Sequence, residues 1–491
     1  MSQPHCSGEK GPITEAICRE RQGRKFNKCA DCSFHDPKLT EGAWNAQKDP
    51  HHKIFKAYDI RGVYPNELNE KLAEMIGSAV ARFLSPGALV VSRDMRLSSE
   101  SLSRALSQGI LTAGCDVLDC GQLSTDANYF AIAYYRKGGG VQVTASHNPP
   151  QYNGFKISRE QAIPLSYESG LANVERLALS IPARPAEHRG KAEHLDVMAD
   201  WKSHVLNFGR KLEPLNVVID AGNGMAGKML PPILAELPIK VTDLFFKLDG
   251  TFPNHEANPL KPENLRDLQK AVREKGADLG VAFDGDADRC VFVDETGAAV
   301  SSDMVTALLS RSLLLAHPKS AIVYDLRSSR VVAEEIRRGG GFPVRERVGH
   351  SYIKATMRQR NAIFGGELSG HFYWRENYFA DSGAITMMMM LNLLSAERRS
   401  LSDLLRPLHR YFSTGEVNFE VASKEAKLAA LAAAFKDGRA DTLDGLTVEY
   451  DDWWFNVRPS NTEPALRLNL EANTQELMEA KKKQIVEILG S

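Results

Sequence analysis

A serine on a tight turn and a run of alternating carboxylates are the residues of this chain best suited to chemistry. Ser146 stands on an Asn-Pro turn that follows an apolar strand. Asp284, Asp286 and Asp288 follow a second apolar strand and suit a hard divalent cation such as Mg²⁺, which takes oxygen ligands. A serine that can carry a phosphate and a metal held by carboxylates are together the minimal requirement for phosphoryl transfer.

The spacing of the aspartates also fits a calcium-binding EF-hand loop. Counting Asp284 as the first position, Glu295 falls at the twelfth, where such a loop carries a bidentate glutamate. However, Arg289 stands at the sixth position, where the EF-hand needs a glycine for its sharp turn. Strands rather than helices are predicted on both sides. We therefore favour a catalytic Mg²⁺ site, with the guanidinium of Arg289 beside it to grip a phosphate oxygen.

Two further polar segments suit a phosphorylated sugar. Glu367, Ser369 and His371 occupy alternate positions, so an extended backbone would place all three on one side. A carboxylate and a hydroxyl suit the hydroxyl groups of a sugar, and an imidazole can exchange protons near neutral pH. The second segment combines a guanidinium with three small donors on a loop bounded by prolines, which is typical of a phosphate cradle, and consists of Arg458, Ser460, Asn461 and Thr462.

In this order, these segments resemble the α-D-phosphohexomutase family, specifically its phosphomannomutase/phosphoglucomutase branch. The resemblance extends from about residue 55 to the C-terminus and rests on the motifs 144–149, 284–289, 366–371 and 458–464. It implies reversible transfer of phosphate between the 1- and 6-positions of a hexose, mannose or glucose, through a phosphoserine enzyme. A hexose 1,6-bisphosphate is the expected intermediate and activator.

The resemblance also implies a role for each matching residue. The transferable phosphate is carried by Ser146, and Glu367 and Ser369 bind the sugar, while the loop of Arg458 holds the phosphate that does not react. The predicted ligands of one Mg²⁺ per chain are Ser146, Asp284, Asp286 and Asp288. Catalytic roles are predicted for Ser146, His147, Lys156, Arg61 and His371. Further substrate contacts are predicted for Tyr58, Arg289, Gly349, His350 and Arg327, the last standing where many relatives have lysine.

Three other functions stay open. The first is a glucosamine or N-acetylglucosamine phosphate mutase, although Leu368 is typical of the mannose and glucose enzymes and glucosamine mutases usually carry glutamine there. The second is a catalytically silent sugar-phosphate-binding regulatory protein, which the intact Ser146 and aspartates disfavour. The third is a phosphatase that hydrolyses its phosphoserine intermediate.

Length and charge limit the class of protein. A chain of 491 residues is long enough for about three or four domains. A formal net charge of −1 provides no field that would attract nucleic acid, and no apolar run has the length of a membrane span. The polar N-terminus lacks the apolar core of a signal peptide. We therefore expect a cytoplasmic protein, a monomer or homodimer, that binds small hexose phosphates and neither nucleic acid nor membranes.

The order of predicted strands and helices indicates the fold class. Strand-like runs alternate with helical spacing up to about residue 411, which indicates sheets flanked by helices, and an α+β order follows. We expect three related α/β domains and a smaller α+β C-terminal domain around a central cleft. The expected bounds are 51–196 with the phosphoserine loop, 197–299 with the metal loop, 300–411 with the sugar loop, and 412–491 with the phosphate-binding loop.

We expect residues 1–50 to be a separate arm, and they hold four of the seven cysteines. Cys29 and Cys32 form a Cys-x₂-Cys pair, and Cys6 and Cys18 could complete a four-thiolate site for a structural Zn²⁺. A disordered basic arm with incidental thiols and an iron–sulfur cluster stay open as alternatives. The other three cysteines are expected to be reduced residues of the core, namely Cys115, Cys120 and Cys290.

Overall fold

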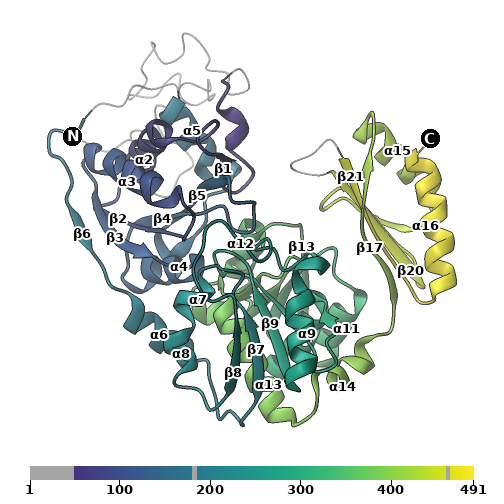
Figure 1. Ribbon diagram of the computed structural model, residues 1–491. Coiled ribbons are helices and arrows are strands. Elements are labelled where there is room, and N and C mark those ends of the chain that lie inside the picture. Colours follow the sequence, from purple (N-terminus) through teal and green to yellow (C-terminus); the bar gives the residue numbers. More distant parts are fainter. Residues whose placement is uncertain (1–48, 180–184, 460–464, 491) are drawn as a thin grey trace.

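The computed structural model describes residues 49–179, 185–459 and 465–490 (Figure 1). Two groups of predicted site residues lie outside these ranges. They are the cysteines of the arm, Cys6, Cys18, Cys29 and Cys32, and three residues of the phosphate loop, Ser460, Asn461 and Thr462. Among the described helices, none combines the length and the apolar character needed to span a membrane.

The first domain is built on a six-stranded sheet in the order β1-β5-β4-β2-β3-β6. Its strands are β1 (Ile60–Val63), β2 (Ala88–Arg93), β3 (Asp116–Gln122), β4 (Gly139–Val143), β5 (Tyr152–Arg159) and β6 (Ala192–His194). Its helices are α2 (Glu70–Leu84), α3 (Ser99–Thr112), α4 (Thr125–Tyr134) and α5 (Ala172–Leu179). Strand β5 runs antiparallel to both β4 and β1, whereas β4, β2, β3 and β6 are parallel.

The second domain has a five-stranded sheet in the order β11-β10-β9-β7-β8. Its strands are β7 (Asn216–Asp220), β8 (Lys240–Leu244), β9 (Leu279–Phe283), β10 (Cys290–Val293) and β11 (Ala299–Val300). Its helices are α6 (Met198–Leu206), α7 (Ala226–Met229), α8 (Pro231–Leu234) and α9 (Arg266–Lys275).

The third domain has a sheet in the order β13-β12-β14-β15-β16. Its strands are β12 (Ala321–Asp325), β13 (Phe342–Glu346), β14 (Phe364–Gly366), β15 (Phe372–Trp374) and β16 (Ala380–Asp381). Its helices are α10 (Ser302–Ala316), α11 (Arg330–Arg338), α12 (His350–Arg360), α13 (Gly383–Glu397) and α14 (Leu401–Leu405).

The fourth domain has an antiparallel sheet in the order β17-β21-β20-β19-β18. Its strands are β17 (Phe412–Glu420), β18 (Arg439–Asp441), β19 (Leu446–Glu449), β20 (Trp453–Pro459) and β21 (Ala465–Ala472), and its helices are α15 (Lys424–Ala434) and α16 (Gln475–Gly490). Figure 1 shows it at one side of the molecule, beyond the third domain.

The first three domains repeat one strand arrangement. In each, a central parallel strand pairs on its other side with the antiparallel strand that follows it, as β4 with β5, β9 with β10, and β14 with β15. The loop between these two strands holds Ser146 in the first domain, the three aspartates in the second, and Glu367 in the third. The predicted fold class, three related α/β domains followed by a smaller α+β domain, is confirmed.

The cores show how firmly the domains are joined. One hydrophobic cluster runs through all three α/β domains and includes Phe130, Trp201, Phe283 and Trp374. The fourth domain has a cluster of its own. The predicted core cysteines are free and buried, as expected, namely Cys115, Cys120 and Cys290. The first three domains therefore share a continuous core, and the fourth does not.

Glycine at position 109 lets α2 and α3 pack closely, which gives a test of the first domain. A Cβ at Gly109 would lie 1.9 Å from the carbonyl oxygen of Glu74. We expect Gly109→Ala to lower the free energy of unfolding by about 3 kcal/mol, since two helix backbones must separate. Urea denaturation measures this. The control is Gly87→Ala, which meets no atom within 4 Å; equal denaturation midpoints for the two variants would contradict the expectation.

Candidate active site

Ser146 lies fully buried where the first and second domains meet. Its Oγ donates a hydrogen bond to Asp284 Oδ2 at 2.8 Å and lies 3.2 Å from His147 Nδ1. The backbone at Ser146 is left-handed, with φ of 50°, a conformation that side-chain-bearing residues rarely adopt. The facing loop comes so close that a Cβ at Gly285 would lie 2.6 Å from the Ser146 carbonyl oxygen. The predicted serine and aspartate loops are thus in direct contact.

Arg96, for which the sequence suggested no role, holds the Ser146 loop in place. Its guanidinium has no exposed surface. It donates four hydrogen bonds of 2.6 to 3.1 Å to carbonyl oxygens of this loop, those of Ser146, Asn148, Pro149 and Tyr152. Because one rigid, buried guanidinium bonds all four carbonyls, it fixes the path of the chain through them.

Asp94 and Thr144 complete this support. Asp94 pairs with Arg96 Nε at 3.2 Å and accepts a hydrogen bond from Thr144 Oγ1 at 2.7 Å. Thr144 Oγ1 in turn accepts one from the backbone N–H of Ser146 at 2.9 Å. Asp94 follows the parallel strand β2, and the carboxyl ends of such strands are where α/β proteins place their sites. Its position directly after a parallel strand could have identified Asp94 as a site residue from the sequence.

The three aspartates of the metal loop are buried, and one oxygen of each lies within 4.8 Å of the others. Burial and the two neighbouring carboxylates raise the pKa of Asp284 well above its usual range. Burial also acts to raise the pKa of Asp288, but Lys156 and His371 outweigh it and hold that pKa well below the usual range. Lys156 Nζ donates to Asp286 Oδ2 at 2.7 Å and to Asp288 Oδ2 at 2.5 Å.

The aspartates also keep oxygens that the described residues leave unsatisfied. Asp286 Oδ1 and Asp288 Oδ1 are buried and accept no hydrogen bond from this part of the chain. Buried polar atoms normally have partners, so two such oxygens on one loop fit the ligands of a divalent cation. The three aspartates could therefore hold a metal. The flanking elements are the strands β9 and β10 rather than helices, which excludes the EF-hand alternative.

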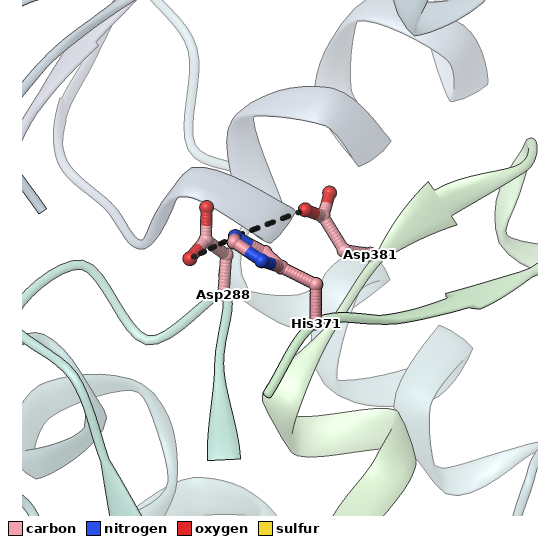
Figure 2. A group of neighbouring side chains, drawn as sticks. All are labelled: Asp288, His371 and Asp381. Carbon is pink, nitrogen blue, oxygen red and sulfur yellow. Dashed lines mark ion pairs between the residues drawn. The ribbon is translucent and has the colours of Figure 1, made fainter. Parts of the chain in front are cut away.

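His371 connects this loop with the third domain. Figure 2 shows its ring between two carboxylates, with Nε2 at 3.6 Å from Asp288 Oδ1 and 3.7 Å from Asp381 Oδ2. Arg289 Nε lies 3.2 Å from the same nitrogen. Asp381 also pairs with the fully buried Lys354 at 2.7 Å. Charged groups of three domains thus meet around the aspartates.

The segment from Glu367 to His371 is a tight turn, not the extended segment that its alternating pattern suggested. The N–H of Glu367 donates to the His371 carbonyl at 2.9 Å, and Gly370 takes φ of 84°. The reason is that β14 and β15 are adjacent antiparallel strands with little chain between them. The turn still gathers the predicted side chains, since His371 Nδ1 lies 2.9 Å from Ser369 Oγ and 3.6 Å from Glu367 Oε2.

The predicted substrate contacts of the first and third domains lie side by side. The ring of Tyr58 is 5.3 Å from that of His350, which is 6.3 Å from that of His371. Gly349 has φ of 134°, and a Cβ there would lie 2.9 Å from the Tyr58 ring. A larger residue at position 349 would therefore push these two domains apart.

Arg61 contacts the serine loop, and His147 is part of it. Arg61 donates to Asn148 Oδ1 and to Asp59 Oδ2, both at 2.5 Å, and so holds the turn after the serine. Burial lowers the pKa of His147 well below its usual range, and the nearby Arg289 adds to this effect. The imidazole of His147 is therefore neutral at physiological pH.

A network of charged side chains around Glu416 joins the fourth domain to the turn of residues 367–371, which we call the sugar turn. Glu416 accepts a hydrogen bond from Arg458 Nη2 at 2.9 Å and lies 3.6 Å from Arg327 Nη1. Arg327 lies 3.7 Å from Glu367 Oε1 and pairs with Asp325 at 2.8 Å. Burial acts to raise the pKa of Glu416, but the arginines outweigh it and lower that pKa below its usual range. Arg458 and Arg327 thus belong to one network with the sugar turn.

Three further residues of the site had no role in the sequence-based prediction. Thr125 donates from Oγ1 to Asp286 Oδ2 at 2.5 Å, and Asp325 accepts from the N–H of Leu368 at 2.7 Å. Asp325 ends the parallel strand β12, which was a usable signal. Thr125 and Glu416 gave no such signal in the sequence, because their partners are distant in the chain.

Together these groups can transfer a phosphate. The Ser146 hydroxyl can carry it, the aspartates can seat a cation, and Lys156 and Arg289 offset negative charge. The sugar turn and the arginines of the Glu416 network can bind the rest of a phosphorylated sugar.

Comparison with known proteins agrees with this chemistry. The chain matches the family models of phosphoglucomutase/phosphomannomutase, namely alpha/beta/alpha domain I over residues 52–181, domain II over 193–297, domain III over 301–411 and the C-terminal domain over 416–488.

Individual relatives align with most of the chain. A phosphomannomutase of Escherichia coli is 39% identical over 449 residues, with 89% of this chain and 98% of that protein covered. The phosphohexose mutases of Xanthomonas campestris pv. campestris are 40% identical over 441 residues, with the same two shares covered. The crystal structure of a phosphoglucomutase/phosphomannomutase family protein from Burkholderia thailandensis has a TM-score of 0.83 at 34% identity and covers 89% of this chain and 97% of its own.

The support that Arg96 gives to the serine loop can be tested by substitution. Arg96→Met removes the guanidinium that these four carbonyls share, so we expect faster hydrogen exchange at residues 145–149. We also expect a kcat about 100-fold lower with little change in KM, because the hydroxyl is displaced while the substrate contacts remain. Arg96→Lys should recover only part of the rate, since an ammonium lacks the planar fork of donors. The control is Arg104→Met at an exposed position. Unchanged hydrogen exchange and unchanged kcat in Arg96→Met would contradict this role of Arg96.

Proposed function

The chain belongs to the phosphoglucomutase/phosphomannomutase family, and we propose that it interconverts the 1- and 6-phosphates of a hexose, with mannose and glucose as its sugars. As a phosphohexose mutase it is an enzyme of the phosphotransferase and isomerase class. The observation that carries the proposal is the contact between the buried Ser146 hydroxyl and the aspartate loop. A phosphate on this hydroxyl would lie beside a cation seat and two protein cations, as phosphoryl transfer requires.

The proposed reaction begins with a phosphate on Ser146 Oγ. The free hydroxyl of the bound hexose phosphate attacks the phosphorus, the bond from phosphorus to Ser146 Oγ breaks, and a hexose 1,6-bisphosphate forms. The proton of the attacking hydroxyl passes to a base, for which His371 is our candidate because its ring lies between Ser369 and the aspartate loop. The bisphosphate then turns over, and its other phosphate returns to Ser146.

The cations of the chain would stabilise the charge that develops. A phosphoserine carries roughly −1.5 to −2 charges and lies beside buried carboxylates. Burial acts to lower the pKa of Lys156, but Asp286 and Asp288 outweigh it and raise that pKa well above its usual range, so the ammonium stays charged. We assign to Arg61 the orientation of the serine loop, through its hydrogen bond to Asn148 Oδ1. Mg²⁺ held by the three aspartates and the phosphate on Ser146 would supply further charge stabilisation.

The sugar and its second phosphate would be held by the third and fourth domains. We assign the hydroxyl groups of the sugar to Glu367 and Ser369, which must accept both orientations of the bisphosphate. We assign the phosphate that does not react to Arg458 and Arg327. Glu416 already pairs with both arginines, so an arriving phosphate would compete with this carboxylate for the same guanidinium groups.

Three further predictions rest on the sequence alone and stay predictions. The first is cytoplasmic localisation and the second is a monomer or homodimer. The third is a structural Zn²⁺ on the cysteines of residues 1–50.

Ser146→Ala tests the proposed function directly. With catalytic hexose 1,6-bisphosphate present, we expect the wild type to convert both mannose 1-phosphate and glucose 1-phosphate. The variant should lose several orders of magnitude in kcat, because the covalent route is gone. Intact mass should show one added phosphate on the wild type and none on the variant.

The matched control for this experiment is Ser107→Ala on α3, which should behave as the wild type. Near-normal turnover by Ser146→Ala would refute the phosphoserine route. Steady release of inorganic phosphate by the wild type would point instead to a phosphatase.

Asp286→Asn tests the metal site. An amide is a poorer ligand than a carboxylate for a hard cation, so we expect Mg²⁺-dependent turnover to be abolished with little change in thermal stability. Titration calorimetry should show Mg²⁺ binding to the wild type and to the exposed control Asp243→Asn, but not to Asp286→Asn. Full activity of the wild type in excess EDTA is the result that would contradict a catalytic metal.

A further inference from the structure

A basic pocket of about 470 Å³ lies between the first and third domains. One side is formed by the end of α4 and the turn after β5, and the other by the end of α12 and the connection from β15 to β16. Its volume falls within the range of small-molecule sites, about 300 to 1,000 Å³. None of its lining residues belongs to the predicted catalytic or substrate contacts.

The positive charge of this pocket is largely uncompensated. Arg136 and Lys137 line it from the first domain, and Arg358 lines it from the third. Over residues 49–179, 185–459 and 465–490, no carboxylate lies within ion-pair distance of these three side chains. The acidic residue of the lining, Glu160, is paired with Arg159 at 3.1 Å. The pocket therefore presents cations that have no anion of their own.

Arg358 shows this imbalance most clearly. Its guanidinium is partly buried and donates only to carbonyl oxygens, including those of Gln161 at 3.0 Å and Tyr378 at 2.7 Å. Burial without a carboxylate partner lowers the pKa of Arg358 to about 10. Since desolvating a charge without an opposite charge is unfavourable, an anion in the pocket would relieve this cost. Gln161 belongs to the first domain and Tyr378 to the third, so Arg358 also ties the two walls together.

The walls are held in a strained backbone conformation. Arg136, Gln161, Tyr378 and Phe379 all line the pocket, and their φ angles lie between 52° and 61°. Side-chain-bearing residues seldom take this left-handed conformation, and where they do, they cluster at ligand sites and switch regions. Four such residues from two domains surround one pocket. This concentration is a second observation, independent of charge, that points to a ligand.

Both helices that end at the pocket begin at the catalytic site. Helix α4 starts at Thr125, which bonds Asp286, and its length of about 15 Å separates that residue from the pocket. Helix α12 starts at His350, beside Tyr58. Midway, Lys354 Nζ of α12 lies 3.9 Å from the centre of the Tyr129 ring of α4. A ligand in the pocket would therefore contact the two helices that position both sides of the catalytic site.

We propose that this pocket binds a small anion with two or more phosphate charges, which bridges the first and third domains. Arg136 and Lys137 bind it from one domain and Arg358 from the other, through charge-assisted hydrogen bonds. The bound anion holds the ends of α4 and α12 together and so regulates the placement of the catalytic site. This role does not depend on the sugar that the enzyme converts.

The test measures anion binding away from the catalytic site. The variant Arg136→Gln/Lys137→Gln removes two pocket charges, and the matched control Lys71→Gln/Arg104→Gln removes two exposed charges elsewhere in the same domain. Pyrophosphate and ADP are titrated by calorimetry into each full-length protein saturated with glucose 1-phosphate. We expect at least tenfold weaker binding to the pocket variant and unchanged binding to the control.

Hydrogen exchange with pyrophosphate locates the bound anion whether or not the enzyme turns over. Slower exchange at residues 133–137 and 375–381 in the wild type, absent from the pocket variant, supports the proposal. Tighter binding of ADP than of pyrophosphate would indicate that the pocket also contacts the base. Equal binding of the two would indicate that it recognises the phosphates alone. Either result supports the proposal. Equal affinity of the pocket and control variants overturns the proposal. So does protection confined to the Ser146 loop, or no binding of either probe at millimolar concentration.

Discussion

Neutralisation of three buried carboxylates is the constraint on which the rest of this structure depends. Asp284, Asp286 and Asp288 lie on one short loop with almost no exposed surface. Charges buried in this way cost several kcal/mol each unless other charges offset them. The compensating groups come from three domains, with Lys156 from the first, Arg289 from the second and His371 from the third. The loop can therefore adopt this structure only when the three domains have packed around it.

The repeated strand arrangement explains how three domains can supply one site. Each places a loop between a central parallel strand and the antiparallel strand that follows it. The first repeat supplies Ser146, the second the aspartates, and the third the turn of Glu367. The hydrophobic cluster that runs through all three domains fixes these loops relative to one another. One strand arrangement thus presents a different set of polar side chains on the equivalent loop of each domain.

The fourth domain is joined in a different way. Its core is separate, and arginines of the third domain form hydrogen bonds with it. Arg330 donates to the carbonyl oxygens of Tyr450, Asp451 and Trp453, and Arg458 meets Arg327 through Glu416. Polar interfaces of this kind commonly permit relative domain motion. The first three domains, by contrast, share one hydrophobic cluster.

The sequence by itself determined the fold class, the family and the hexose phosphate mutase activity, all of which are confirmed. It could do so because the motifs are local and because strands and helices alternate with distinct periods. The roles of the individual site residues stay proposals. Only the tertiary structure decided that the segment after β14 is a turn, that Arg96 holds the Ser146 loop, and that Glu416 joins Arg458 to Arg327. These arrangements depend on carbonyls and carboxylates brought together from distant parts of the chain, and no local pattern encodes such contacts.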